Sequence, residues 1–236
     1  MNNIVVFGGS GAIGEALVKQ LSNENPQAKL HVFSRNIPAY SLSNMTTYTL
    51  DFLNEDQLEN NAARIKDPID LVIVATGKLH GKGCSPEKSL RDLSYEKMME
   101  LYSVNTIGPA MIAKYFLPKL NRKSRSVFAA ISARVGSIED NRLGGWYAYR
   151  MSKTALNMFL KTASIEQKRT HKNSAVIGLH PGTVDSDLSK PFQSNVPQGK
   201  LFTPDYSAEK LLSVIKGVTP ADSGQIFAWD GEIIPY

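Results

Sequence analysis

Two residues in the sequence, Tyr149 and Lys153, have types and a spacing suited to proton transfer. Because they are four residues apart, they fall on one face of a helix, one turn from each other. A phenol with a pKa near ~10 is a poor acid at neutral pH, but a neighbouring ammonium group stabilises its anion. Tyr149 is therefore a candidate proton donor. On its own the pair is weak evidence, because a surface Tyr/Lys pair has the same spacing.

A glycine-rich segment near the start of the chain predicts a phosphate-binding loop. The apolar run 3–7 precedes Gly9, Gly11 and Gly14, which satisfy the spacing G-x-G-x-x-G, and helical periodicity resumes behind them. Such glycines let the turn fold tightly and let the backbone approach a pyrophosphate at a helix N-terminus. We expect a dinucleotide to be bound by the residues of this loop: Gly8, Gly9, Ser10, Gly11, Ala12, Ile13 and Gly14.

The end of the second expected strand, 29–33, indicates which dinucleotide binds. An acidic residue about 20 positions past the glycines would bind a ribose 2′-hydroxyl, whereas an arginine accommodates a 2′-phosphate. The sequence has Ser34, Arg35 and Asn36 here, with no carboxylate. A guanidinium and a hydroxyl suit a phosphate, so NADP(H) is favoured over NAD(H). The alternative is a solvated loop arginine.

Strand and helix patterns alternate along the rest of the chain. Residues 69–75 and 126–131 are almost wholly apolar, which is typical of strands buried on both faces of a parallel sheet. We also expect strands at 46–50, 175–179 and 225–229, and helices at 55–65, 95–120 (with Pro109 as a possible kink), 146–170 and 207–216. This order predicts a single Rossmann-like, doubly wound α/β domain over residues 1–236, with about seven parallel strands flanked by helices.

Ligands of an open parallel sheet bind where its strands end. Four residues at such ends are expected to face the cofactor: Asp51 after the third strand, and Ala75, Thr76 and Gly77 at the end of the fourth. Residues 132–145 form a long loop of the kind that often carries function. The segment 186–204, rich in Pro, Gln and Ser, is expected to be a lid over the site, with Leu188, Phe192 and Val196 as apolar contacts.

The composition limits the classes of partner. The 236 residues carry a net charge of +5 without dense Lys/Arg blocks, so no nucleic-acid surface is expected. Cys84 is the only cysteine, so an intramolecular disulfide is impossible. Asp185 and Asp187 lack the further oxygen ligands of a metal site, and no metal is expected. No leader segment or membrane span is evident, so we expect a soluble cytoplasmic protein.

Taken together, these motifs resemble the short-chain dehydrogenase/reductase family. The residues of several segments are similar to its C-factor-like (cell–cell signalling factor) subgroup. The resemblance spans essentially the whole length. It rests on six segments in order: Gly8–Gly14, Ala75–Gly77, Val104–Gly108, Ser132–Ile138, Tyr149–Lys153 and His180–Val184. Six matching segments in the same order are specific evidence for the family, whereas a single matching segment would not be.

The resemblance implies a role for each matching residue. Tyr149 would be the acid/base, Lys153 would lower its pKa and hold the nicotinamide ribose, and Asn105 would keep a water in the proton relay. An oxidised nicotinamide ring would further stabilise the phenolate. Four residues would pack against the nicotinamide: Pro181, Gly182, Thr183 and Val184. Relatives commonly form homodimers or homotetramers, and the helices 95–120 and 147–170 offer apolar surface for such assembly.

Two departures from the family pattern matter. Ala133 stands where the second serine of Ser-Ser-x-x-Gly polarises the substrate carbonyl, so Ser132 or Ser137 is expected to supply the hydroxyl instead. In the glycine loop, Ala12 replaces a common glycine while Gly11 restores the spacing. The expected function is an NADPH-dependent carbonyl reductase, or the reverse alcohol dehydrogenase, acting on a small molecule. The alternative is an NADP(H)-responsive binding or signalling protein with weakened catalysis.

Overall fold

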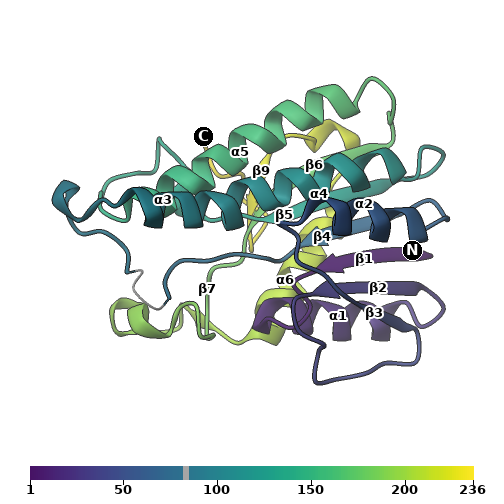
Figure 1. Cartoon of the computed structure of the whole chain (residues 1–236), viewed down its shortest axis with the longest axis horizontal. Coiled ribbons are helices and arrows are strands. Elements are labelled where there is room, and N and C mark those ends of the chain that lie inside the picture. Colours follow the sequence, from purple (N-terminus) through teal and green to yellow (C-terminus); the bar gives the residue numbers. More distant parts are fainter. Residues whose placement is uncertain (82–84) are drawn as a thin grey trace.

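A computed structural model of the protein describes residues 1–81 and 85–236, and Cys84 lies outside the described residues. Its centre is a seven-stranded sheet in the order β3-β2-β1-β4-β5-β6-β9, in which every neighbouring pair is parallel (Figure 1). The strands are β1 (Asn3–Phe7), β2 (Lys29–Ser34), β3 (Met45–Thr49), β4 (Leu71–Val74), β5 (Ser126–Ile131), β6 (Ser174–His180) and β9 (Ile226–Ala228). This topology confirms the predicted doubly wound α/β fold.

Helices cover both faces of the sheet (Figure 1). They are α1 (Ala12–Glu24) and α6 (Pro204–Gly217) on one face, and α2 (Glu55–Arg64), α4 (Gly108–Phe116) and α5 (Tyr147–Gln167) on the other. Strand β1 shows why both faces are needed. Ile4 and Val6 pack into the core beneath α1 and α6, whereas Val5 and Phe7 point to the opposite core, because side chains alternate along a strand.

The predicted helix over 95–120 is correct in extent but is not one regular helix. It consists of α3 (Tyr95–Tyr102), a π-helical turn (Ser103–Ile107), α4 and a final 3₁₀ turn (Leu117–Lys119). In the π turn the N–H of Gly108 bonds to the carbonyl of Ser103. Pro109 has no N–H to donate and its ring clashes with the carbonyl four residues earlier, so regular α-helical bonding is interrupted just before it.

The two long loops contain short structured segments. A 3₁₀ turn, Arg134–Gly136, lies between β5 and α5. In the expected lid, a 3₁₀ segment spans Lys190–Asn195. The lid is also anchored, because β7 (Thr183–Val184), just before it, pairs in parallel with β8 (Leu201–Phe202) near its end.

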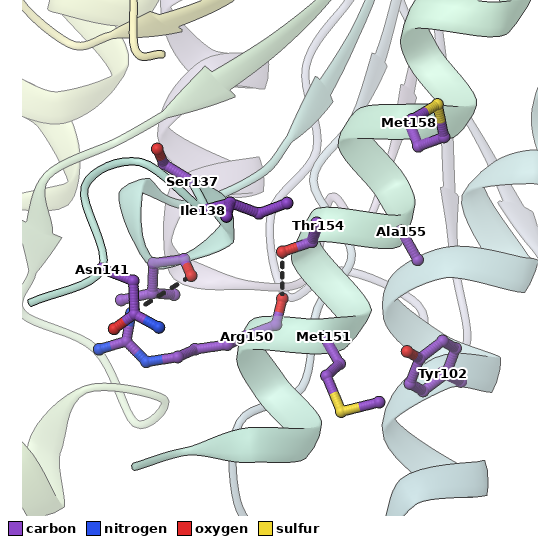
Figure 2. A pocket seen from close by; sticks show the side chains of 10 residues that line it. Tyr102, Ser137, Ile138, Asn141, Arg150, Met151, Thr154, Ala155 and Met158 are labelled. Carbon is purple, nitrogen blue, oxygen red and sulfur yellow. Dashed lines mark hydrogen bonds between the residues drawn. The ribbon is translucent and has the colours of Figure 1, made fainter. Parts of the chain in front are cut away.

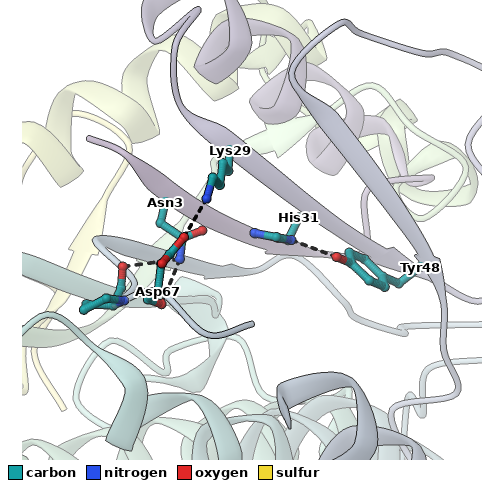
Figure 3. Close-up of polar contacts among 6 residues, drawn as sticks. Asn3, Lys29, His31, Tyr48 and Asp67 are labelled. Atoms are coloured by element: carbon teal, nitrogen blue, oxygen red, sulfur yellow. Dashed lines mark hydrogen bonds and ion pairs between the residues drawn. The ribbon is translucent and has the colours of Figure 1, made fainter. Parts of the chain in front are cut away.

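Polar contacts link the starts of β1 and β2 to Asp67, which precedes β4, and link β2 to β3 (Figure 3). Lys29 forms an ion pair with Asp67 at 2.6 Å, and the Asn3 amide donates to the Asp67 carbonyl at 3.0 Å. His31 on β2 shares a 3.0 Å hydrogen bond with the hydroxyl of Tyr48 on β3. Within the described ranges, no helix is long and apolar enough to cross a membrane.

Candidate active site

The glycine loop packs as tightly as the motif predicts. A Cβ on Gly14 would lie 2.1 Å from the Gly8 carbonyl oxygen, and one on Gly9 would lie 2.2 Å from a methyl carbon of Val32 on β2. Helix α1 begins at Ala12, and its N-cap residue, Gly11, makes no side-chain capping bond. The first backbone N–H groups of α1 are therefore available to an anion.

The loop also meets the end of β4. Gly8 has φ +86°, and a Cβ there would lie 2.9 Å from the backbone of Ala75. Strand β1 lies between β2 and β4, which is where the winding of the chain reverses direction and where such sheets bind ligands. Tyr40, which no sequence motif marks, holds the loop from outside, because its hydroxyl donates to the Gly9 carbonyl at 2.8 Å.

The structure brings four predicted residues together next to this crevice. A Cβ on Gly77 would lie 3.7 Å from both the Asn105 Oδ1 and the Lys153 Nζ. The Lys153 Nζ lies 5.9 Å from the centre of the Tyr149 ring and donates to the Ile131 carbonyl, at the end of β5, at 2.9 Å. Residues from the β4 loop, the π turn and α5 therefore converge on one point.

Burial dominates the electrostatics of the pair. It raises the pKa of the Tyr149 phenol to about 12 and lowers the pKa of the Lys153 ammonium to about 8. Both shifts follow from desolvation, because an apolar environment disfavours the phenolate and the ammonium alike. At neutral pH Tyr149 therefore holds its proton and Lys153 is mostly charged, which is the state needed to protonate an alkoxide.

Asn105, which lies in the π turn, is held by hydrogen bonds to two other segments. Its side-chain amide pairs with the backbone of Lys78 in both directions, at 2.8 Å each, and donates to the Ser152 hydroxyl at 3.1 Å. Ser152 in turn donates to the Tyr149 carbonyl at 2.8 Å. Both amide protons of Asn105 are thus used within the protein, so a relay water would have to donate to an oxygen of this residue.

The two serines near Ala133 both form hydrogen bonds within the protein. The Ser132 hydroxyl is buried and donates to the Asn157 Oδ1 at 2.6 Å, so it would have to break this bond to polarise a carbonyl. The Ser137 hydroxyl accepts from the backbone N–H of Asp140 at 3.1 Å and lines a cavity of about 440 Å³ (Figure 2). Tyr149 does not line this cavity. Ala133 itself packs against the cluster that contains Tyr149.

The remaining predicted residues lie around the crevice. Ser34 is buried and donates to the Asn36 carbonyl at 2.5 Å, while Arg35 is exposed. Asp51 is exposed and accepts from the Leu53 N–H at 3.0 Å. Ser10 and Ala12 are exposed on the glycine loop, with Ile13 half-buried behind them.

The segment after β6 is bent by a glycine. Gly182 has φ +75°, and a Cβ there would lie 2.5 Å from the Phe202 ring, so only glycine fits. Pro181 is fixed by the Ser207 hydroxyl, which donates to its carbonyl at 2.9 Å. Thr183 and Val184 form β7, which places the start of the lid directly beside the end of β6.

Glu87, which was not predicted to belong to the site, is buried against the N-terminus of α5. Trp146, the N-cap residue of α5, has φ +51°, which is rare for any residue other than glycine. Its N–H donates to the Glu87 carbonyl at 2.6 Å, and the Ala148 N–H donates to the Glu87 side chain at 3.2 Å. Glu87 therefore positions the first turn of the helix that carries Tyr149. No local motif in the sequence marks this contact.

The crevice fits a dinucleotide. The Thr76 hydroxyl, at the end of β4, is buried and has no hydrogen-bond partner among the described residues, so it can bond to a ligand. Together with the close-packed glycine loop and the uncapped start of α1, it forms a cradle for phosphate and ribose groups. In the described residues, no group of three or more potential metal ligands occurs.

Comparisons with known proteins identify a family of dehydrogenases. Residues 2–197 match the model of the family described as short chain dehydrogenase. The C-signal protein of Myxococcus xanthus is 33% identical over 169 residues, which cover 72% of this chain and 93% of that protein.

Two solved structures share the fold. They are the carbonyl reductase Sniffer of D. melanogaster and the NADPH-bound carbonyl reductase from chicken fatty liver, each with a TM-score of 0.86 and 24% identity. Each match covers 100% of this chain. It covers 100% of the Sniffer chain and 99% of the chain of the chicken enzyme. At this level of identity they establish the fold alone.

Proposed function

Because the chain belongs to the short chain dehydrogenase family and to its C-factor-like type, we propose that it is an NADPH-dependent carbonyl reductase, or an alcohol dehydrogenase in reverse. The observation that carries the proposal is the convergence of Gly77, Asn105, Tyr149 and Lys153 at the cofactor crevice. Structural relatives described as carbonyl reductases, one of them bound to NADPH, support it.

When bound, NADPH supplies the hydride that reduces the carbonyl carbon. The glycine loop and the start of α1 would hold its pyrophosphate, and Thr76 would offer its unpartnered hydroxyl. Arg35 would pair with the 2′-phosphate, because its guanidinium is exposed where β2 ends. Lys153 would bind the nicotinamide ribose, and 181–184 would pack against the nicotinamide.

In this proposal Tyr149 donates its proton to the substrate oxygen as negative charge develops there. Lys153, whose ammonium lies 5.9 Å from the centre of the tyrosine ring, stabilises the phenolate that remains. Asn105 would orient the water that returns a proton from solvent. Ser132 would contribute a hydrogen bond to the substrate oxygen only after exchanging its bond with Asn157.

We further propose that the protein assembles as a homodimer or homotetramer through the outer face of α5. Met151 and Met158 on this face are 43% and 66% exposed and border the cavity of Figure 2. Light scattering at micromolar concentration tests this, and a monomeric mass would contradict it.

The function is tested by screening carbonyl compounds for NADPH consumption and by titrating NADPH and NADH calorimetrically. We expect turnover of at least one compound and tighter binding of NADPH. Equal affinities for the two cofactors would contradict the cofactor assignment.

A second candidate is an NADP(H)-responsive binding or signalling protein. Two observations favour it: Ala133 replaces the expected serine, and the matched relative from Myxococcus xanthus is described as C-signal. NADPH binding without turnover across a broad carbonyl screen would support this role over the reductase.

A further inference from the structure

A wall of aromatic side chains lies beside Tyr149. The indole of Trp146 and the Tyr149 ring are 6.2 Å apart, centre to centre, at 70°. Phe192 of the lid lies 5.0 Å from Trp146, and its other side meets the His80 ring at 5.6 Å. The rings come from three separate segments: the loop after β4, the start of α5 and the lid. We call Trp146, Phe192 and His80 the aromatic wall.

The position of Trp146 is maintained against backbone strain. A left-handed conformation is strained for a bulky residue, and such residues persist only where their surroundings hold them. Here the backbone and the carboxylate of buried Glu87 hold the turn, through bonds of 2.6 and 3.2 Å to the N–H groups of Trp146 and Ala148. The left-handed backbone of Trp146 places its indole next to the Tyr149 phenol.

A polar contact links the lid to the loop after β4, which carries His80. The Nε2 of His80 shares a 3.0 Å hydrogen bond with the Asp187 carbonyl, which joins the loop after β4 to the start of the lid. Phe192 lies on the 3₁₀ segment Lys190–Asn195, five residues further on. The ring of Phe192 is thereby held against both Trp146 and His80.

Apolar side chains also pack around Tyr149. Leu79, Leu101 and Ala148 are buried with it in one cluster, and Ala133 and Val135 pack against that cluster. A substrate that placed a charged or strongly polar group here would lose its hydration without gaining a partner from these side chains. An aromatic ring, in contrast, gains both apolar contact and edge-to-face packing.

From these observations we propose that the substrate is an aryl carbonyl compound, with the ring attached to the reacting carbonyl carbon, and that Trp146 and Phe192 select it. The inference rests on the proposed reductase function, because it places the substrate carbonyl at Tyr149. If the carbonyl oxygen lies at the Tyr149 phenol, an aromatic ring bonded to the carbonyl carbon would lie against the aromatic wall, which flanks the phenol.

The test compares two ketones of the same skeleton, acetophenone and cyclohexyl methyl ketone, which differ in whether the ring is aromatic. The measured quantity is the ratio of their kcat/KM values in the unmodified protein and in Trp146→Leu and Phe192→Leu. Differences in intrinsic reactivity between the ketones cancel between proteins. Each substitution should lower the ratio about 2- to 13-fold, the range expected for one aromatic pair.

Tyr95→Leu is the matched control, because this aromatic residue is 75% exposed at the start of α3. Its ratio should equal that of the unmodified protein. Since Trp146→Leu alters a strained position, Phe192→Leu on the lid carries the test if the first variant does not fold. A ratio unchanged in a folded wall variant would overturn the assignment of the wall, while turnover of both ketones would leave the reductase function intact.

A binding measurement separates this inference from the proposed function. Benzamide and cyclohexanecarboxamide have the same ring difference but a carbonyl that resists reduction, so their affinities for the NADPH-loaded protein need no turnover. We expect tighter binding of benzamide and loss of that preference in Phe192→Leu. Equal affinities would refute the aromatic wall. Selective benzamide binding with no turnover of any ketone would contradict the reductase function instead.

Discussion

The proposed mechanism makes a quantitative prediction for Tyr149→Phe, Lys153→Met and the double variant. Phenylalanine keeps the ring and its packing but removes the transferable proton. General acid catalysis by a positioned side chain typically contributes about 10²–10⁴-fold, so turnover should fall by that factor. NADPH affinity should change little, because we propose that the tyrosine hydroxyl contacts the substrate and not the phosphates.

The effect of Lys153 follows from its distance to the phenol. Its Nζ lies 5.9 Å from the centre of the tyrosine ring. At an effective dielectric constant of about 20, unit charges at that separation interact by about 3 kcal/mol, which corresponds to roughly 10²-fold in rate. Lys153→Met should therefore lower turnover about 10²-fold. It should also weaken NADPH binding, because the ammonium is proposed to hold the ribose.

The double variant decides whether the two residues act together. If the lysine stabilises the phenolate, it has nothing to stabilise once the hydroxyl is gone, so the double variant should turn over no more slowly than Tyr149→Phe. Steady-state rates at saturating NADPH measure this, with calorimetry for cofactor affinity and circular dichroism for folding. Additive losses would refute the coupling, and full activity in Tyr149→Phe would refute the mechanism itself.

Four further outcomes are expected. Arg35→Ala should weaken NADPH binding about 10- to 100-fold without affecting NADH, because a charged hydrogen bond to the 2′-phosphate is lost; calorimetry measures both. Gly14→Ala should lower the free energy of unfolding by about 1–3 kcal/mol or more in denaturant titrations, since its Cβ would lie 2.1 Å from the Gly8 carbonyl, whereas Gly217→Ala meets nothing within 4 Å and should not. Because burial lowers the pKa of Lys153 to about 8, kcat/KM for NADPH should fall as the pH rises through that value and the ammonium is lost; a flat profile well above it would contradict the role. Ala133→Ser should raise turnover, by up to about 10²-fold, because it adds a donor within the Tyr149 cluster; unchanged rates would show that the serine position is not limiting.

Much of the framework follows from local sequence patterns. The apolar run of β1, the glycine spacing and the periodicity of α1 are all short-range signals, and the structure has each of them where expected. The same holds for Tyr149 and Lys153, since residues four apart on one helix must share a face. Gly77 follows β4, which lies next to β5 in the sheet, whereas Asn105 was predicted only from the family resemblance.

The contacts that were missed depend on how distant segments meet. Glu87 reaches the start of α5 from a loop 61 residues earlier, and no sequence pattern marks such a bond. The Ser132 hydroxyl is directed to Asn157 by the packing of β5 against α5, which composition cannot reveal. The left-handed Trp146 follows Gly144 and Gly145, both with positive φ, so the glycine pair was the one available signal of an unusual turn.

The π turn between α3 and α4 has a consequence for chain length. A π turn holds one residue more than an α-helical turn, so deleting one residue from 103–107 would restore regular bonding across the junction. The widened turn that carries Asn105 would then close up, because the extra residue that it accommodates is gone. Asn105 would then lose its place between Lys78 and Ser152. A deletion that leaves every remaining side chain unchanged is therefore expected to damage this site more than most substitutions in the same segment.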